Sequence, residues 1–242
     1  MRRLFTIAAV VLTAPLASIA AQSTDRVPVD MNRLRCGSDT AEVWVTRGGV
    51  RRRTGTATEV CRSIDTGSAR RVMRISRIKD EVYGTHLDTI VDSWNTLEPR
   101  SHRSTGTRPG ANLKFQLEWS GDRVRGRIDA QGMAPFTVDQ RMPSLVYNSA
   151  SMDLVLRAAP LASGYSISVP VYTPGRGVTE FTAVVADEEF VAGQLVWRIE
   201  ADFGGADHTF WVAKASRAVL KQNFRLDATT EIEFIFLGTG RR

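Results

Sequence analysis

The sequence of 242 residues contains only two cysteines and three histidines. This scarcity argues against a thiol-rich zinc site and against a dense disulfide framework. The chain also lacks the glycine-rich phosphate loop, the His-Glu-x-x-His motif of zinc proteases and the Gly-x-Ser-x-Gly elbow of serine hydrolases. The sequence therefore indicates no cofactor and no thiol-rich metal site, and it contains none of these three motifs.

Long hydrophobic runs are also missing, apart from one near the N-terminus. Arg2 and Arg3 precede an apolar run over residues 4–16, which is too short to span a bilayer and is followed by Ser18-Ile19-Ala20. This order predicts a signal peptide over residues 1–20, cleaved after Ala20, and a mature protein that is periplasmic or secreted and not membrane-spanning. An uncleaved amphipathic or membrane helix is the alternative.

The mature chain, residues 21–242, is predicted to form a single β domain. Its length suits one sandwich or barrel, and no linker divides it. The composition, 43% hydrophobic and 24% charged, is that of a globular protein. Only residues 21–30 are expected to be loosely held.

Alternation of apolar and polar residues is the dominant pattern. Every second side chain in residues 112–119 is large and apolar, and the alternation resumes over residues 123–128 after a turn at Ser120-Gly121-Asp122. This period of two predicts a hairpin with one buried face. Further strands are predicted over residues 57–64, 70–78, 81–91, 100–104, 165–171, 181–185, 195–199, 220–224 and 232–236.

The strands do not alternate with helices, as those of a parallel sheet would. We therefore predict a mainly β fold, an antiparallel meander that forms a curved sheet, half-barrel or barrel. One short helix is predicted near residues 144–158, because Pro143-Ser144 is a typical helix start and the apolar residues that follow recur at helical spacing. A strand over residues 154–157 is the alternative.

The two cysteines, Cys36 and Cys61, are predicted to form a disulfide, because export permits pairing and their number is even. Two unpaired thiols are the alternative. The bond would stabilise a basic region, since residues 21–79 carry 13 lysines and arginines against 6 acidic residues.

The densest basic stretch is a candidate contact for an anionic envelope surface. A solvated strand edge, protected by its charges from pairing with another sheet, is the alternative. Export argues against a nucleic-acid partner. The stretch contains Arg47, Arg51, Arg52 and Arg53, with Arg70, Arg71, Arg74 and Arg77 downstream.

Few residues suggest catalysis or metal binding. Ile64-Asp65-Thr66-Gly67-Ser68 matches an aspartic-protease loop, but one copy would need a homodimer, and the same residues are typical of a hairpin turn. His86 and Asp88 would share a strand face and reach a metal only with Asp207 or His208, so hydrogen-bonded strand residues are the favoured interpretation. A Ser-His-Asp triad assembled from distant residues stays open.

Six large aromatic residues on the apolar strand faces are candidates for the lining of a ligand cavity inside the curved sheet. The alternative for each of them is an ordinary core position. They are Phe115, Trp119, Trp197, Trp211, Phe234 and Phe236.

Residues 142–236 contain four stretches whose order along the chain resembles that of a known family. They are Met142-Pro143-Ser144-Leu145, residues 161–167, residues 210–221 and the closing apolar strand. In this respect the chain resembles a large uncharacterised family of bacterial periplasmic proteins, a domain of unknown function. The tryptophan-containing hairpin also resembles the sheets of periplasmic lipoprotein carriers, which implies a curved antiparallel sheet enclosing lipid. The family resemblance implies no catalytic residues.

These observations predict an exported envelope protein that binds a lipid or another hydrophobic or amphiphilic ligand in a curved β-sheet cavity. A non-catalytic structural or interaction module of envelope assembly is the alternative. An aspartic-protease-like enzyme with a single motif is the third hypothesis.

Overall fold

The computed structural model describes residues 26–67, 69–82, 84–108, 111–142 and 145–238. Within these ranges one sheet contains 15 strands, in the order β8-β7-β6-β5-β4-β3-β2-β1-β15-β14-β13-β12-β11-β10-β9. The strands are β1 (Ser38–Arg47), β2 (Val50–Thr66), β3 (Ala69–Asp80), β4 (Gly84–Ser93), β5 (Pro99–Arg108), β6 (Ala111–Ser120), β7 (Arg123–Ala130), β8 (Phe136–Arg141), β9 (Tyr147–Asn148), β10 (Ser166–Thr173), β11 (Gly177–Val191), β12 (Gln194–Phe203), β13 (Asp207–Ala213), β14 (Val219–Arg225) and β15 (Thr230–Phe236).

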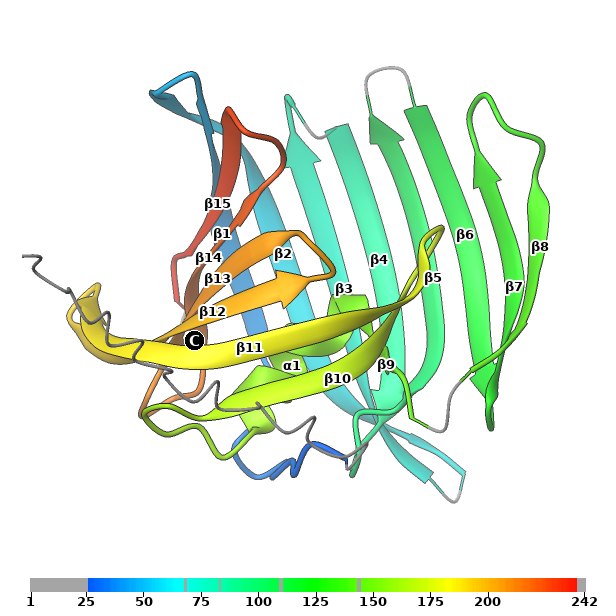
Figure 1. Cartoon of the computed structure of the whole chain (residues 1–242), viewed down its shortest axis with the longest axis horizontal. Helices are drawn as coiled ribbons and strands as arrows, with labels where there is room; N and C mark the ends of the chain where they lie inside the picture. Colours follow the sequence, from blue (N-terminus) through cyan, green and yellow to red (C-terminus); the bar gives the residue numbers. More distant parts are fainter. Residues whose placement is uncertain (1–25, 68, 83, 109–110, 143–144, 239–242) are drawn as a thin grey trace, which may run out of the picture.

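Neighbouring strands pair antiparallel, apart from the short parallel contact of β9 with β10. This confirms the predicted mainly β antiparallel meander. Because β8 and β9 are the two edges, the sheet is open and corresponds to the curved-sheet or half-barrel alternative rather than to a closed barrel. β1 pairs with β15, which joins the two halves of the chain, and the curled sheet places β10–β12 across β2–β4 with helix α1 (Met152–Ala158) between them (Figure 1).

Alternation in the sequence locates most of these strands. The predicted hairpin corresponds to β6 and β7, with Leu117 opposite Gly126. Strand β13 does not show this alternation, because Phe210, Trp211 and Val212 are consecutive apolar residues that are all buried. Both faces of that strand are covered, so the sequence shows no period of two there.

The predicted helix is present but shorter than expected. A 3-10 turn, η1 (Ser149–Ser151), leads into α1, whereas residues 145–146 are irregular and residues 147–148 form β9. The Asn148 side chain accepts a hydrogen bond from the Ala150 N–H at 3.1 Å, so the helical turns begin after this cap. The start signal expected at Pro143-Ser144 lies outside the described residues.

Helix α1 fills the interior of the curved sheet. It packs against apolar residues from both halves of the sheet, including Val72 of β3 and Phe181 of β11. Near its C-terminus the buried Arg157 donates hydrogen bonds to the carbonyl oxygens of Arg35 at 2.7 Å and Arg217 at 3.0 Å. The apolar side chains that α1 buries are those of Met152, Leu154, Val155, Leu156 and Ala158.

Residues 26–30 lie against this core. Val27 is buried, and its N–H donates to the Tyr147 hydroxyl at 3.2 Å. The Asp30 N–H donates to the Ala158 carbonyl at 2.9 Å. This part of the segment expected to be loose is therefore packed. Residues 21–25 and the predicted signal peptide lie outside the described residues.

The predicted disulfide joins Cys36 to Cys61, with their Cα atoms 4.7 Å apart. Cys61 lies on β2 and is part of the main core, so the bond ties the segment before β1 to that core. This confirms the pairing inferred from the even number of cysteines.

Loss of this disulfide is expected to destabilise the protein. We expect Cys61→Ser to lower the free energy of unfolding by about 2 kcal/mol, near the low end of the usual cost because the domain has a large core of its own. Urea denaturation of the oxidised protein measures this loss, with the exposed Ser63→Ala on the same strand as control. Equal stability of the two variants would contradict the prediction.

Candidate functional site

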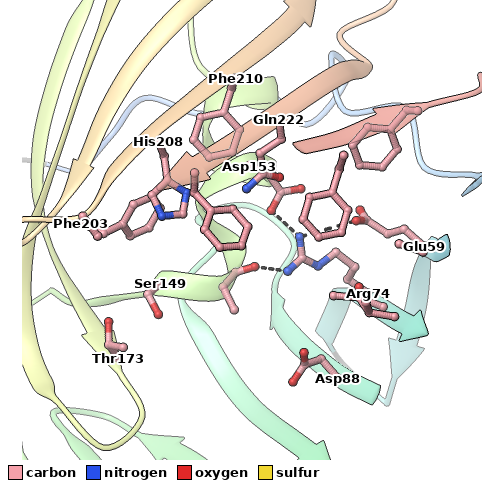
Figure 2. Close-up of a pocket in the computed structure, with 18 of the residues that line it drawn as sticks. Glu59, Arg74, Asp88, Ser149, Asp153, Thr173, Phe203, His208, Phe210 and Gln222 are labelled. Carbon is pink, nitrogen blue, oxygen red and sulfur yellow. Dashed lines mark hydrogen bonds and ion pairs between the residues drawn. The ribbon is translucent and has the colours of Figure 1, made fainter. Parts of the chain in front are cut away.

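The concave side of the sheet contains a half-open cavity of about 430 Å³. One wall consists mainly of aromatic side chains from β12–β15, with Gln222 among them. The facing wall contains charged and polar side chains from β2–β4 beside Ala57 and Ile78 (Figure 2). Ser149, Ala150 and Asp153 from η1 and α1 line its base, and Thr173 and Arg176 reach it from the β10–β11 turn. The long-range pairing of β1 with β15 brings these two walls together.

The aromatic wall is a chain of ring contacts. The His208 ring lies 4.4 Å from the Phe203 ring and stacks on Phe224 at 5.1 Å, and Phe224 lies 6.1 Å from Phe234. Burial lowers the pKa of His208 to about 4, so its ring is uncharged at neutral pH. This wall is therefore mainly apolar, and it carries no charge at neutral pH.

The charged wall is organised around Arg74 on β3, a buried residue. Its guanidinium donates hydrogen bonds to the Asp153 carboxylate and to the Ala150 carbonyl oxygen. Burial alone would lower the pKa of Arg74, but the carboxylates of Asp153 and Glu59 hold that pKa above its ordinary value. Arg74 is therefore a permanent cation that fastens η1 and α1 to β3.

Two groups of this wall retain hydrogen-bonding capacity. In the part of the chain that the structure describes, Arg74 Nε has no hydrogen-bond partner. The Glu59 carboxylate lies 3.9 Å from Arg74 Nη1, which is too far for a hydrogen bond. Burial raises the pKa of Glu59, and the negative charge of Asp153 adds to this shift although Arg74 opposes it. A ligand can interact with both groups.

A second polar cluster surrounds Asp88 on β4. Its two carboxylate oxygens contact His86 Nε2 at 2.9 Å and His102 Nε2 at 3.0 Å. Burial would raise the pKa of Asp88, but these two hydrogen bonds hold it well below its usual range. Gly106 leaves room for the His86 ring, because a Cβ atom at that position would lie 2.3 Å from His86 Nδ1.

This cluster also holds the helical turns in place. Asn148 uses its side-chain oxygen to cap η1, so its amide nitrogen faces His102 Nδ1 at 3.2 Å. His102 Nδ1 is then an acceptor, and its Nε2–H donates to Asp88. The cluster therefore positions the base of the cavity through His102 and Asn148.

Asp92 is a further buried carboxyl beneath the helical turns. It is fully buried on β4, and Ser151 donates a hydrogen bond to its Oδ2 at 2.7 Å. Its Oδ1 has no hydrogen-bond partner among the described residues. Burial raises the pKa of Asp92 to about 7, although the bond from Ser151 and the charge of Arg74 oppose this shift.

The six predicted aromatic residues lie in different places. Phe234 and Phe236 line the cavity. Trp197 packs in the main core, where Arg217 lies 4.5 Å from its ring. Trp211 donates from its indole to Glu189 and packs in a separate cluster. It lies on the face opposite Phe210, because neighbouring residues of a strand alternate between faces.

The remaining two, Phe115 and Trp119, belong to a cluster beside the cavity, under the β10–β11 hairpin. The Trp119 ring contacts Tyr172 of β10 at 5.8 Å, and the Phe115 ring contacts His102 at 4.7 Å. The structure thus brings together two of the six residues at the cavity. The lining also contains aromatic residues that are not among the six predicted ones, namely Phe203, His208, Phe210 and Phe224.

The residues considered for catalysis occupy structural positions. Asp65 lies at the exposed end of β2, where Thr66 Oγ1 donates to the Ala69 carbonyl across a hairpin turn, as the turn interpretation expects. Ser68 of the same motif lies outside the described residues. Ser104 and Asp88 both contact His86 through Nε2, whereas a catalytic triad engages the two ring nitrogens separately.

The described residues do not form the metal site considered for His86 and Asp88. Within the described ranges, no group of three histidine, cysteine, aspartate or glutamate side chains is placed to hold a metal ion. His86 and Asp88 instead hydrogen-bond to each other, in agreement with the favoured interpretation as hydrogen-bonded strand residues. His208 belongs to the aromatic wall.

Three of the four arginines in the densest basic stretch lie within 4 Å of carboxylates from β1, β15 and the turn after β3. Arg51 pairs with Glu233, Arg52 lies 3.9 Å from Glu81 and Arg53 lies 3.3 Å from Glu42, while Arg47 is exposed. The downstream Arg74 is not part of this surface, because its side chain is buried in the cavity wall. Contact of Arg47, Arg51, Arg52 and Arg53 with an anionic surface stays a prediction.

Within the described residues, no helix is long and apolar enough to cross a membrane. The fold and the site together define an open antiparallel β-sheet protein with an internal cavity.

The chain belongs to the family described as protein of unknown function DUF3108, whose model matches residues 31–233. This match extends well beyond residues 142–236, on which the family resemblance is visible. No protein with a curated description matches the chain.

Proposed function

We propose that this is an exported cell-envelope protein that binds a hydrophobic or amphiphilic molecule in the cavity of its curved sheet. The observation that carries the proposal is the cavity itself, in which a mainly aromatic wall faces a wall of largely buried charged groups. Its volume of about 430 Å³ is within the range of small-molecule sites, roughly 300 to 1,000 Å³. An amphiphile can place its apolar body on one wall and its polar group on the other.

Two sequence features support location in the envelope. The order of basic, apolar and small residues over residues 1–20 is typical of a cleaved signal peptide. The Cys36–Cys61 disulfide fits an oxidising compartment such as the periplasm. Both features are consistent with a ligand from the envelope, such as a lipid.

The proposal predicts that wild-type protein purified from its native envelope yields a lipid or another amphiphile on solvent extraction and mass spectrometry. Ser76 lines the cavity on β3, so Ser76→Trp is expected to fill the space and reduce the recovered ligand about tenfold or more. The control is Ser63→Trp, which adds the same indole at an exposed position of β2.

Two results would contradict the proposal. One is recovery of no such molecule from wild-type protein, and the other is equal recovery from Ser76→Trp. A protein without a ligand that cross-links to one stoichiometric partner would instead favour an interaction module of envelope assembly.

A further inference from the structure

The charges that line the cavity do not balance. Three carboxylates, those of Glu59, Asp88 and Asp153, face two guanidinium groups, those of Arg74 and Arg176. Arg176 is exposed on the β10–β11 turn, whereas the three acidic side chains are at most 19% exposed. The buried part of the charged wall therefore contains more acidic than basic groups.

Only one of these carboxylates is free of strong contacts. Asp88 binds two histidines, and Asp153 accepts a hydrogen bond from Arg74. Among the described residues Glu59 accepts no hydrogen bond, and its closest cationic atom is Arg74 Nη1 at 3.9 Å. Arg74 uses Nη1 and Nη2 for Asp153 and Ala150, and among the described residues only its Nε–H is left without a partner. Glu59 is thus the carboxylate of this wall that most needs a partner, and an ionised carboxylate accepts from a hydrogen-bond donor.

The opposite wall is compatible with a cation. It consists of phenyl rings, a stacked His208 and the uncharged amide of Gln222, so no ionised group of that wall would repel a positive charge at neutral pH. The faces of aromatic rings attract cations through their quadrupole. An anionic head group would meet three largely buried carboxylates, and Arg74 would offer it only the Nε–H, because Nη1 and Nη2 already donate to Asp153 and Ala150.

We infer that the ligand of this cavity carries a protonated amine on an apolar body, with the ammonium group bound by Glu59 and the apolar part against the aromatic wall. This inference rests on the proposed function, because it names the chemical class of the molecule bound at the same site. It excludes fatty acids and other anionic amphiphiles as the preferred ligands.

Displacement of a neutral fluorescent probe tests this inference. The wild-type protein is saturated with N-phenyl-1-naphthylamine, which is uncharged at neutral pH, and the probe is displaced by decylammonium, decanol or decanoate. These competitors share one chain length and differ in their head group. We expect decylammonium to bind about tenfold more tightly than decanoate, with decanol between them.

The variant Glu59→Gln is expected to remove most of this preference while the probe still binds. Its matched control is Asp65→Asn, which neutralises an exposed carboxylate on the same strand and should leave the order unchanged. Equal or tighter binding of decanol or decanoate, or an unchanged preference in Glu59→Gln, would overturn the inference and leave the cavity a binding site. Failure of the probe to bind wild-type protein would overturn the proposed function and this inference with it.

Discussion

Arg74→Met is expected to lower the free energy of unfolding by about 3 to 5 kcal/mol, the usual cost of removing one partner of a buried ion pair. Arg74 is buried, and its hydrogen bonds hold Asp153 and Ala150 against β3. Without the guanidinium, the carboxylates of Asp153 and Glu59 would lie next to each other with no cation between them. Urea denaturation at neutral pH measures the loss.

The matched control for this variant is Arg77→Met, which removes an exposed guanidinium from the other face of β3. A change within about 0.5 kcal/mol is expected there, as for most surface substitutions. If both variants lost the same stability, Arg74 would not have the anchoring role assigned to it.

Asp92→Asn is expected to stabilise the protein at alkaline pH and to have little effect near pH 4. Burial raises the pKa of Asp92 in the folded state to about 7, above its ordinary value of 3.8. Between these two pH values the folded protein therefore holds a proton that the unfolded chain releases. The contribution of Asp92 to the free energy of unfolding is fully present below about pH 4 and is lost as pH rises through about 7. Asparagine resembles the protonated acid and avoids this loss.

At pH 8.5 we expect the variant to be more stable than wild type by about 2 to 4 kcal/mol, because a shift of one pKa unit corresponds to about 1.4 kcal/mol. Urea denaturation of both proteins at pH 4.5 and pH 8.5 measures the difference. Asp65→Asn, at an exposed position, controls for general charge effects. A difference that is the same at both pH values would contradict the prediction.

The sequence predicts local structure well where one face of a strand is exposed. The hairpin of β6 and β7 follows directly from alternating residues such as Phe115, Leu117 and Trp119. The same alternation predicts that Arg74 faces the interior, because it shares a strand face with the buried Val72 and the partly buried Ile78. An arginine in phase with apolar neighbours indicates a buried charge, and this distinguishes Arg74 from Arg77.

The cavity itself depends on contacts that no local pattern specifies. Phe234 reaches the site because β15 pairs with β1, where Phe234 lies opposite Val43, 191 positions away in the chain by number. His208 and Phe210 lie on β13, whose alternation is hidden by burial on both faces. Aromatic character alone does not separate Phe234 from Trp211, since only the curvature of the sheet decides which face encloses space.

The most direct test of the cavity as a binding site is a fluorescence titration of N-phenyl-1-naphthylamine into purified protein cleared of bound molecules. The proposed function predicts saturable binding of one probe per chain to wild type and to Ser63→Trp, and loss of that binding in Ser76→Trp. Binding that survives in Ser76→Trp, or no saturable binding to wild type, would contradict it.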